Sequence, residues 1–266
     1  MTSPPFASIE LPATRLRPKP RQRGLTMMAD WGLPLTYQKD LLRMAGRYVD
    51  FAKIVTGTAR LYDADYLAEK LQAYRDAQVR PFIGGQFVEY VFATEGDQAL
   101  RPFFEEARRV GFDTIEISDN CVPLTDEERR HQILLARDCG LAVMGEVGSK
   151  DSHSEPMELV RQARVCLEAG CELVLVEAAE LAKGGRIERA TLDVLVSELD
   201  LTRVMIELPG PWITGVTLSQ VDDLKKLLIT ELGPEINLAN LKPDDLIATE
   251  ALRVGLGVVG PKPPAG

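Results

Sequence analysis

Four apolar runs of this sequence each carry a glutamate near their carboxyl-terminal end. The runs are "DTIEISDN", "LAVMGEVGSKD", "LVLVEAAE" and "RVMIELPG", and the glutamates are Glu116, Glu146, Glu177 and Glu207. A buried carboxylate is costly unless it is paired or bound to a cation. Four carboxylates at the same point of four runs therefore predict one shared polar site, suited to cation binding or acid–base chemistry.

Two lysines are candidates for the opposite charge at this site. Lys53 interrupts the apolar run "DFAKIV", and Lys150 follows the run that carries Glu146. Lys53 is interpreted either as one half of a structural ion pair or as a desolvated cation that binds an anion or donates a proton. We predict Lys53, Lys150 and Glu146 as the catalytic residues.

The carboxylates also suit a hard divalent cation, because magnesium takes oxygen ligands. We predict Mg²⁺ as the cofactor, and its predicted ligands are Glu116, Asp119, Glu146 and Glu177. Two alternatives remain open. The aspartate could instead cap a turn, and the two lysines could neutralise the glutamates without a metal.

Two glycine pairs follow predicted strands, Gly84-Gly85 and Gly184-Gly185. One interpretation makes them turns. The other makes them backbone amides that approach an oxyanion or phosphate without a Cβ in the way.

The apolar runs alternate with segments of helical spacing along the chain. Strands are predicted over residues 24–30, 50–55, 80–84, 113–118, 141–147, 172–178, 203–208 and 235–241. Helical segments such as "TDEERRHQILLARDCG" lie between them; this one begins with an N-cap threonine and acidic residues and ends at glycine.

Eight such units without a linker predict a single (β/α)8 barrel, of the α/β class, over residues 24–256. A doubly wound open sheet is the alternative, but no GxGxxG motif follows the first strand. Active sites of the barrel lie at the carboxyl ends of its strands, so all four glutamates should meet at one mouth.

Composition excludes several other classes of protein. The net charge of -9 argues against a nucleic-acid surface, and no apolar run has the roughly 18 residues that a membrane span needs. The start of the chain carries no secretory signal, so a cytoplasmic protein is expected. Residues 1–23 are predicted as a flexible arm or a strap across the barrel bottom, and residues 257–266 as a Pro/Gly-rich tail.

Several motifs, in order along the chain, resemble the phosphosulfolactate synthase family: "RGLTMMADWGL", "YVDFAKIVTGTA", "GGQFVEY", "GFDTIEISDN", "GEVGSKD" and "INLANL". The resemblance covers residues 21–256 and implies a magnesium-dependent (β/α)8 lyase. Such a lyase adds sulfite to phosphoenolpyruvate, giving a sulfonate on the route to coenzyme M. A small anionic substrate and a homo-oligomer are also implied. The residues assigned to substrate binding are Asp30, Gly84, Gly85, Glu89, Ser118, Lys183, Gly184, Gly185, Glu207, Asn237 and Asn240.

The chain departs from this family pattern at three positions where the family has a cation, namely Trp31, Ser149 and Ala179. A hydrogen bond to a charged group is worth roughly 1.5–3 kcal/mol, so these losses weaken phosphate binding unless Lys183 or Arg186 substitutes. One alternative is a lyase for a less anionic substrate, with Trp31 in the vacated space. Another is a non-catalytic stress-protection or binding barrel, because "RQARVCLEAG" resembles the plant heat-stress-associated branch.

Overall fold

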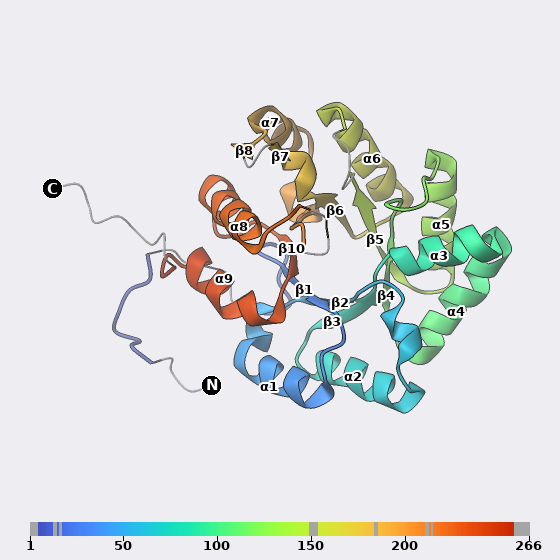
Figure 1. The fold of residues 1–266 in the computed structure, drawn as a ribbon, viewed down its shortest axis with the longest axis horizontal. Helices are drawn as coiled ribbons and strands as arrows, with labels where there is room; N and C mark the ends of the chain where they lie inside the picture. Colours follow the sequence, from blue (N-terminus) through green and yellow to red (C-terminus); the bar gives the residue numbers. More distant parts are fainter. Residues whose placement is uncertain are drawn as a thin grey trace.

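Eight parallel strands close into a barrel in this computed structural model, which describes residues 5–12, 15, 18–148, 154–183, 186–210, 213 and 215–257 (Figure 1). Around the barrel the order is β1-β2-β3-β4-β5-β6-β9-β10, and β10 pairs with β1. The strands are β1 (Thr26–Asp30), β2 (Phe51–Ile54), β3 (Arg80–Ile83), β4 (Thr114–Ile117), β5 (Ala142–Val147), β6 (Leu173–Glu177), β9 (Val204–Glu207) and β10 (Leu238–Leu241). Each predicted strand overlaps one of them, which confirms the (β/α)8 barrel.

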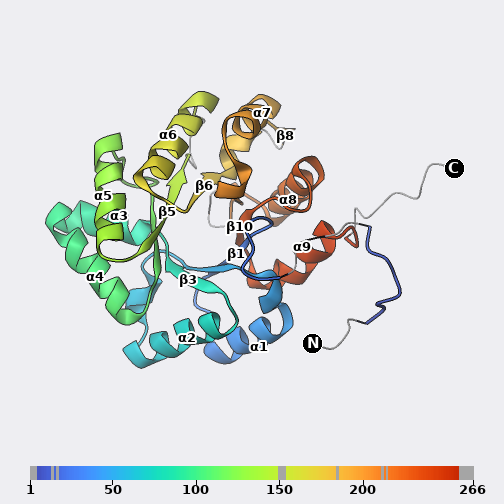
Figure 2. The same cartoon turned by 180° about the vertical axis from the view of Figure 1, so that it is seen from behind.

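Helices surround the barrel, and both views place α9 next to α1, so the first and last helices complete the ring (Figures 1 and 2). The helices are α1 (Leu35–Ala45), α2 (Ala64–Asp76), α3 (Gln86–Glu95), α4 (Leu100–Val110), α5 (Asp126–Asp138), α6 (Pro156–Ala169), α7 (Arg189–Glu198), α8 (Leu218–Leu232) and α9 (Leu246–Arg253). Two short strands, β7 (Ala182–Lys183) and β8 (Arg186–Ile187), form a separate antiparallel pair. Among these described helices, none is both long and apolar enough to cross a membrane.

Capping residues fix where several helices begin and end. Thr125 is the N-cap expected from the sequence. It accepts a hydrogen bond from the backbone of Glu128, and the Glu128 side chain accepts one from the Thr125 amide, so the two residues form a capping box. Gly111 and Gly170 end α4 and α6 with φ of 104°, a conformation that glycine adopts without strain. The bounds of these helices therefore follow from local signals that are visible in the sequence.

Alternation along the strands divides the core into two parts, because successive side chains point to opposite faces. One cluster contains residues such as Phe51, Met144 and Met205 and fills the barrel interior. The other contains their strand neighbours, such as Ala52 and Val143, and packs between the strands and the helices. The direction in which a polar strand residue points therefore follows from counting residues along its strand.

Residues 18–23 of the predicted N-terminal arm lie against the amino-terminal end of the barrel. The buried guanidinium of Arg21 donates two hydrogen bonds to Asp50, at 2.6 and 3.0 Å, and a third to the carbonyl of Tyr48. Asp50 also accepts a hydrogen bond from the backbone amide of Thr26, which begins β1. Residues 18–23 thus form a strap that ties β1 to β2.

Arg21→Ala is expected to lower the free energy of unfolding by roughly 3–5 kcal/mol, because it leaves the Asp50 carboxylate buried without its partner. Urea denaturation measures this change. Arg23→Ala, at an exposed position of the same strap, is the matched control and should change stability by less than about 0.5 kcal/mol. Equal effects of the two variants would contradict the strap.

Candidate active site

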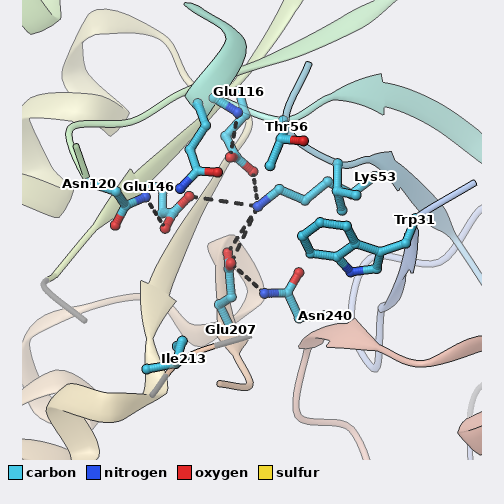
Figure 3. Close-up of a pocket in the computed structure, with 13 residues that line it drawn as sticks. Trp31, Lys53, Thr56, Glu116, Asn120, Glu146, Glu207, Ile213 and Asn240 are labelled. Atoms are coloured by element: carbon cyan, nitrogen blue, oxygen red, sulfur yellow. Dashed lines mark hydrogen bonds and ion pairs between the residues drawn. The ribbon is translucent and has the colours of Figure 1, made fainter. Parts of the chain in front are cut away.

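A pocket of about 350 Å³ opens at the carboxyl ends of the barrel strands (Figure 3). This is the size of a small-molecule site, at the end of the barrel where active sites are found. Its lining residues are Trp31, Lys53, Val55, Thr56, Gly84, Gly85, Gln86, Glu116, Asn120, Glu146, Glu207, Ile213 and Asn240.

The charged centre of the pocket is Lys53, which shares the inner face of β2 with the barrel-core residue Phe51. Its ammonium nitrogen lies 2.9 Å from Glu116, 3.3 Å from Glu207 and 3.7 Å from Glu146 (Figure 3). All four side chains are almost fully buried. Three of the four glutamates singled out in the sequence therefore meet at one mouth, around one of the two predicted lysines.

Each of these carboxylates also accepts a hydrogen bond from a neutral N–H group. The backbone amide of Gly85 donates to Glu116 at 2.7 Å. The side-chain amides of Asn120 and Asn240 donate to Glu146 at 2.6 Å and to Glu207 at 2.5 Å (Figure 3). These contacts hold one oxygen of each carboxylate and so orient the group. Sequence reasoning missed Asn120, although it closes the quoted run "DTIEISDN".

The loop after β4 brings Asn120 to this position, and a buried carboxylate organises the loop. Glu89 on α3 accepts hydrogen bonds from the hydroxyl of Ser118 and from the backbone amides of Cys121 (2.6 Å) and Val122 (2.9 Å). Glu89 and Ser118 were predicted to bind substrate. Neither lines the pocket; they position the residues that do.

The two glycines at the start of α3 line the pocket, but their amides are already used within the protein. The Gly84 amide donates to the carbonyl of Ile54 at 3.1 Å, and the Gly85 amide donates to Glu116. Their role in the structure is steric, because a Cβ on Gly85 would lie 2.1 Å from the Ser118 hydroxyl. The predicted oxyanion cradle is therefore not what this pair forms.

Two other predicted substrate-binding residues lie outside the pocket. Asp30 is an odd number of residues from the inward-facing Met27, so it points outward, where it pairs with Lys70 at 2.6 Å and accepts a hydrogen bond from Tyr74. Its other oxygen caps the turn after β1, which carries Trp31. Asn237 lies at the amino-terminal end of the barrel, where it accepts a hydrogen bond from the amide of Leu25.

The predicted metal ligands are only partly brought together. Oxygens of Glu116, Glu146 and Glu207 lie within 4.8 Å of one another. Glu207 thus takes a place in this group of possible ligands, although it is predicted from the sequence to bind substrate. Asp119 instead forms an ion pair with the buried Arg129, which also donates to the backbone carbonyl of Glu146. Glu177 is buried on β6, where it accepts a hydrogen bond from the Ala179 amide, and it does not line the pocket.

Several predicted residues are not placed. Lys150, Gly184 and Gly185 lie outside the described residues, as does Ser149. Lys183 is described only as part of the strand β7.

Two lining residues, Thr56 and Asn240, adopt left-handed backbone conformations, with φ of 50° and 61°. This conformation is unfavourable for residues other than glycine, and most of all for a β-branched residue such as Thr56. Strain of this kind is concentrated at functional sites, where the surrounding structure enforces it. The strained backbone and the buried charges therefore indicate the same pocket as the functional site.

Burial and charge shift the proton affinities in the pocket. Burial alone lowers the pKa of Lys53, but the three carboxylates around it outweigh this effect and raise its pKa well above the ordinary value. Burial also raises the pKa of Glu116, the neighbouring Glu146 and Glu207 add to that rise, and Lys53 only partly opposes it. Lys53 thus stays charged, while Glu116 can hold a proton.

A (β/α)8 barrel with a buried charged pocket at the carboxyl ends of its strands is typical of enzymes. The profile of the (2R)-phospho-3-sulfolactate synthase (ComA) family matches residues 14–258. The chain belongs to this family, which confirms the resemblance found in the motifs.

Individual relatives agree with this assignment. The chain is 34% identical over 249 residues to a phosphosulfolactate synthase of Methanothermobacter thermautotrophicus, covering 90% of this chain and 91% of the relative. For the phosphosulfolactate synthase of Bacillus subtilis the identity is 32% over 261 residues, covering 94% and 96%. The Arabidopsis thaliana protein HEAT-STRESS-ASSOCIATED 32 is 23% identical over 248 residues, covering 83% and 82%. Family membership supports an enzyme of the lyase class.

The raised pKa of Glu116 predicts a specific pH dependence of stability. The unfolded carboxyl titrates near its ordinary pKa of 4.5, so above that pH the folded protein holds a proton that the unfolded chain releases. The stability from this group is complete below about pH 4.5 and is lost as the pH rises through the folded pKa. The free energy of unfolding of the wild type, relative to Glu116→Gln, should therefore fall as the pH rises above about 4.5.

Urea denaturation of both proteins at several pH values measures this difference. Glu106→Gln, which removes an exposed carboxylate whose pKa is lowered by Arg109, is the control and should give no such fall. A wild-type advantage over Glu116→Gln that stays constant or grows with pH would contradict the shifted carboxyl.

Proposed function

We propose that this protein is a phosphosulfolactate synthase-like carbon–sulfur lyase that adds sulfite to phosphoenolpyruvate or a related small enolisable acid. The observation that carries the proposal is the Lys53 ammonium, enclosed by three carboxylates at the base of the pocket in a barrel of this family. Family membership supplies the type of reaction, and the pocket supplies groups that suit it.

The reaction requires positive charge and one proton. The sulfur lone pair of sulfite attacks the methylene carbon, and the C=C electrons move toward the substrate carboxylate to form an enediolate. A proton then adds to C2. Lys53, whose charge is secured by its surroundings, suits stabilisation of the enediolate, because fixed charges in a dry site stabilise developing charge strongly. The donor of that proton must be a group that does not hold the metal, because a carboxylate that coordinates a metal is deprotonated.

Magnesium is part of this proposal. Three carboxylate oxygens within 4.8 Å of one another are the donor set that a hard cation prefers, so the site fits the metal. Glu116, Glu146 and Glu207 would hold it. When bound, the ion would act as a Lewis acid toward the substrate carboxylate. Asn120 and Asn240 keep the carboxylates oriented toward that position.

The direct test is incubation with sulfite, phosphoenolpyruvate and Mg²⁺, with the sulfonate product detected by mass spectrometry. Lys53→Met should lower kcat/KM by about 10²–10³, because it removes the charge that stabilises the enediolate. Lys39→Met removes a lysine from the exposed surface of α1 and should leave the rate unchanged. Failure to consume sulfite with phosphoenolpyruvate or any related acid, together with no saturable thermal stabilisation by these compounds, would support the non-catalytic alternative.

A second candidate is the same reaction on a less anionic acid, and the position of Trp31 favours it. The indole is 48% exposed and lines the pocket where the family pattern has a lysine. Among the described lining residues, Lys53 is the only cation. A phosphate group would therefore find fewer partners here than the family pattern offers.

Trp31→Lys is expected to shift the preference toward phosphoenolpyruvate over acrylate, a three-carbon unsaturated acid without phosphate. One charge-assisted hydrogen bond corresponds to a change of about tenfold or more in the ratio of the two kcat/KM values. Trp31→Met removes the ring without adding charge and serves as the control. An unchanged ratio in Trp31→Lys would rule out a role for residue 31 in selecting the substrate.

A further inference from the structure

The Lys53 ammonium lies where an ion bound by all three carboxylates would have to lie. Its nitrogen is within 3.7 Å of an oxygen on each of Glu116, Glu146 and Glu207. Those same three residues offer ligand oxygens within 4.8 Å of one another. The close-up shows them converging on the nitrogen from different sides (Figure 3). The same position thus suits both the Lys53 ammonium and a divalent metal ion.

The two cations cannot occupy this position together. Magnesium binds oxygen at about 2.0–2.1 Å, so three coordinated carboxylates would close around the ion and leave no room for an ammonium among them. Two positive charges at contact distance in a buried site also repel strongly. A divalent ion can therefore take the position only if the ammonium leaves it.

The surroundings give the ammonium room to leave. A Cβ on Gly84 would lie 3.1 Å from Cε of Lys53, so the absence of a side chain there makes room for the lysine stem. Lys53 and Gly84 both line the cavity of about 350 Å³, into which the ammonium can move. An anion in that cavity would attract the ammonium into it.

We infer that Lys53 and a divalent cation occupy the three-carboxylate position in turn, and that an anionic ligand in the pocket favours the exchange by binding the displaced ammonium. Lys53 thereby links metal binding to substrate binding. This inference deepens the proposed function and rests on it for the use of a metal.

The test measures Mn²⁺ binding by electron paramagnetic resonance on the full chain, without substrate. Lys53→Met removes the competing charge and should raise the Mn²⁺ affinity about tenfold or more relative to the wild type. Adding Glu207→Gln to that variant should lower the affinity again, since it removes a ligand. Lys53→Gln, which keeps a polar group, is a second variant should the methionine disturb folding, and it should change the affinity in the same direction.

Lys39→Met is the matched control, because it removes the same formal charge from an exposed position on α1. It should leave Mn²⁺ binding as in the wild type. The inference is overturned if the Lys53 variants bind Mn²⁺ no more tightly than this control. It is also overturned if the unaltered chain binds Mn²⁺ tightly without an anion and Glu207→Gln abolishes that binding.

These outcomes are independent of turnover. Sulfonate formation with Mn²⁺ binding that is indifferent to Lys53 would remove this inference and leave the proposed function intact. Tighter Mn²⁺ binding in the Lys53 variants, with no sulfonate formed by the wild type, would support this inference and contradict the proposed function.

Discussion

The pocket of this barrel depends on one interaction, a single ammonium shared by three buried carboxylates. An isolated buried charge costs several kcal/mol, and a buried ion pair offsets this only with good geometry and additional hydrogen bonds. The single positive charge of the ammonium does not neutralise three ionised carboxylates. Burial raises the pKa of Glu116, and the negative charges of Glu146 and Glu207 raise it further, because protonation of that carboxyl relieves part of the excess negative charge. Binding of a cation or of an anionic substrate in the pocket would therefore change how readily the Glu116 carboxyl holds a proton.

The structure around this cluster keeps its members in place. Gly85, Asn120 and Asn240 each fix one carboxylate. Gly85 and Asn120 lie in the connections after β3 and β4, and Asn240 lies near the end of β10. Glu89 holds the loop that carries Asn120, and the Asp119–Arg129 ion pair fixes the end of β5 at the carbonyl of Glu146. Polar residues that do not touch the pocket therefore determine its geometry, as is expected when a preorganised site must resist the repulsion between its own charges.

Trp31 lines the pocket beside the charged centre, and in the proposed function its side chain influences which ligand binds. Asp30 points away from the pocket and caps the turn that follows β1, so the next side chain, Trp31, is set at the mouth by a buried network with Lys70 and Tyr74. The charged base of the pocket and its rim are consequently controlled by separate interactions. Under the proposed function, a change at residue 31 would alter which acid binds without disturbing Lys53 and its carboxylates.

The sequence by itself predicted the eight strands, the barrel and the convergence of strand-end glutamates with a buried lysine. These follow from local periodicity together with the rule that the carboxyl ends of parallel strands share one rim. That Glu116, Glu146 and Glu207 enclose Lys53, and that Glu177 does not line the pocket, was decided by the tertiary structure. Only the tertiary structure decided the roles of Asp30, Asp119 and Asn120, and the use of the glycine amides at the start of α3. Asp30 could have been placed by counting from an inward-facing neighbour, but which residue faces inward is fixed by packing. The other roles depend on contacts between different elements, such as Arg129 on α5 with Asp119 in the loop after β4, or the Gly85 amide with Glu116 on β4, and no local pattern encodes such contacts.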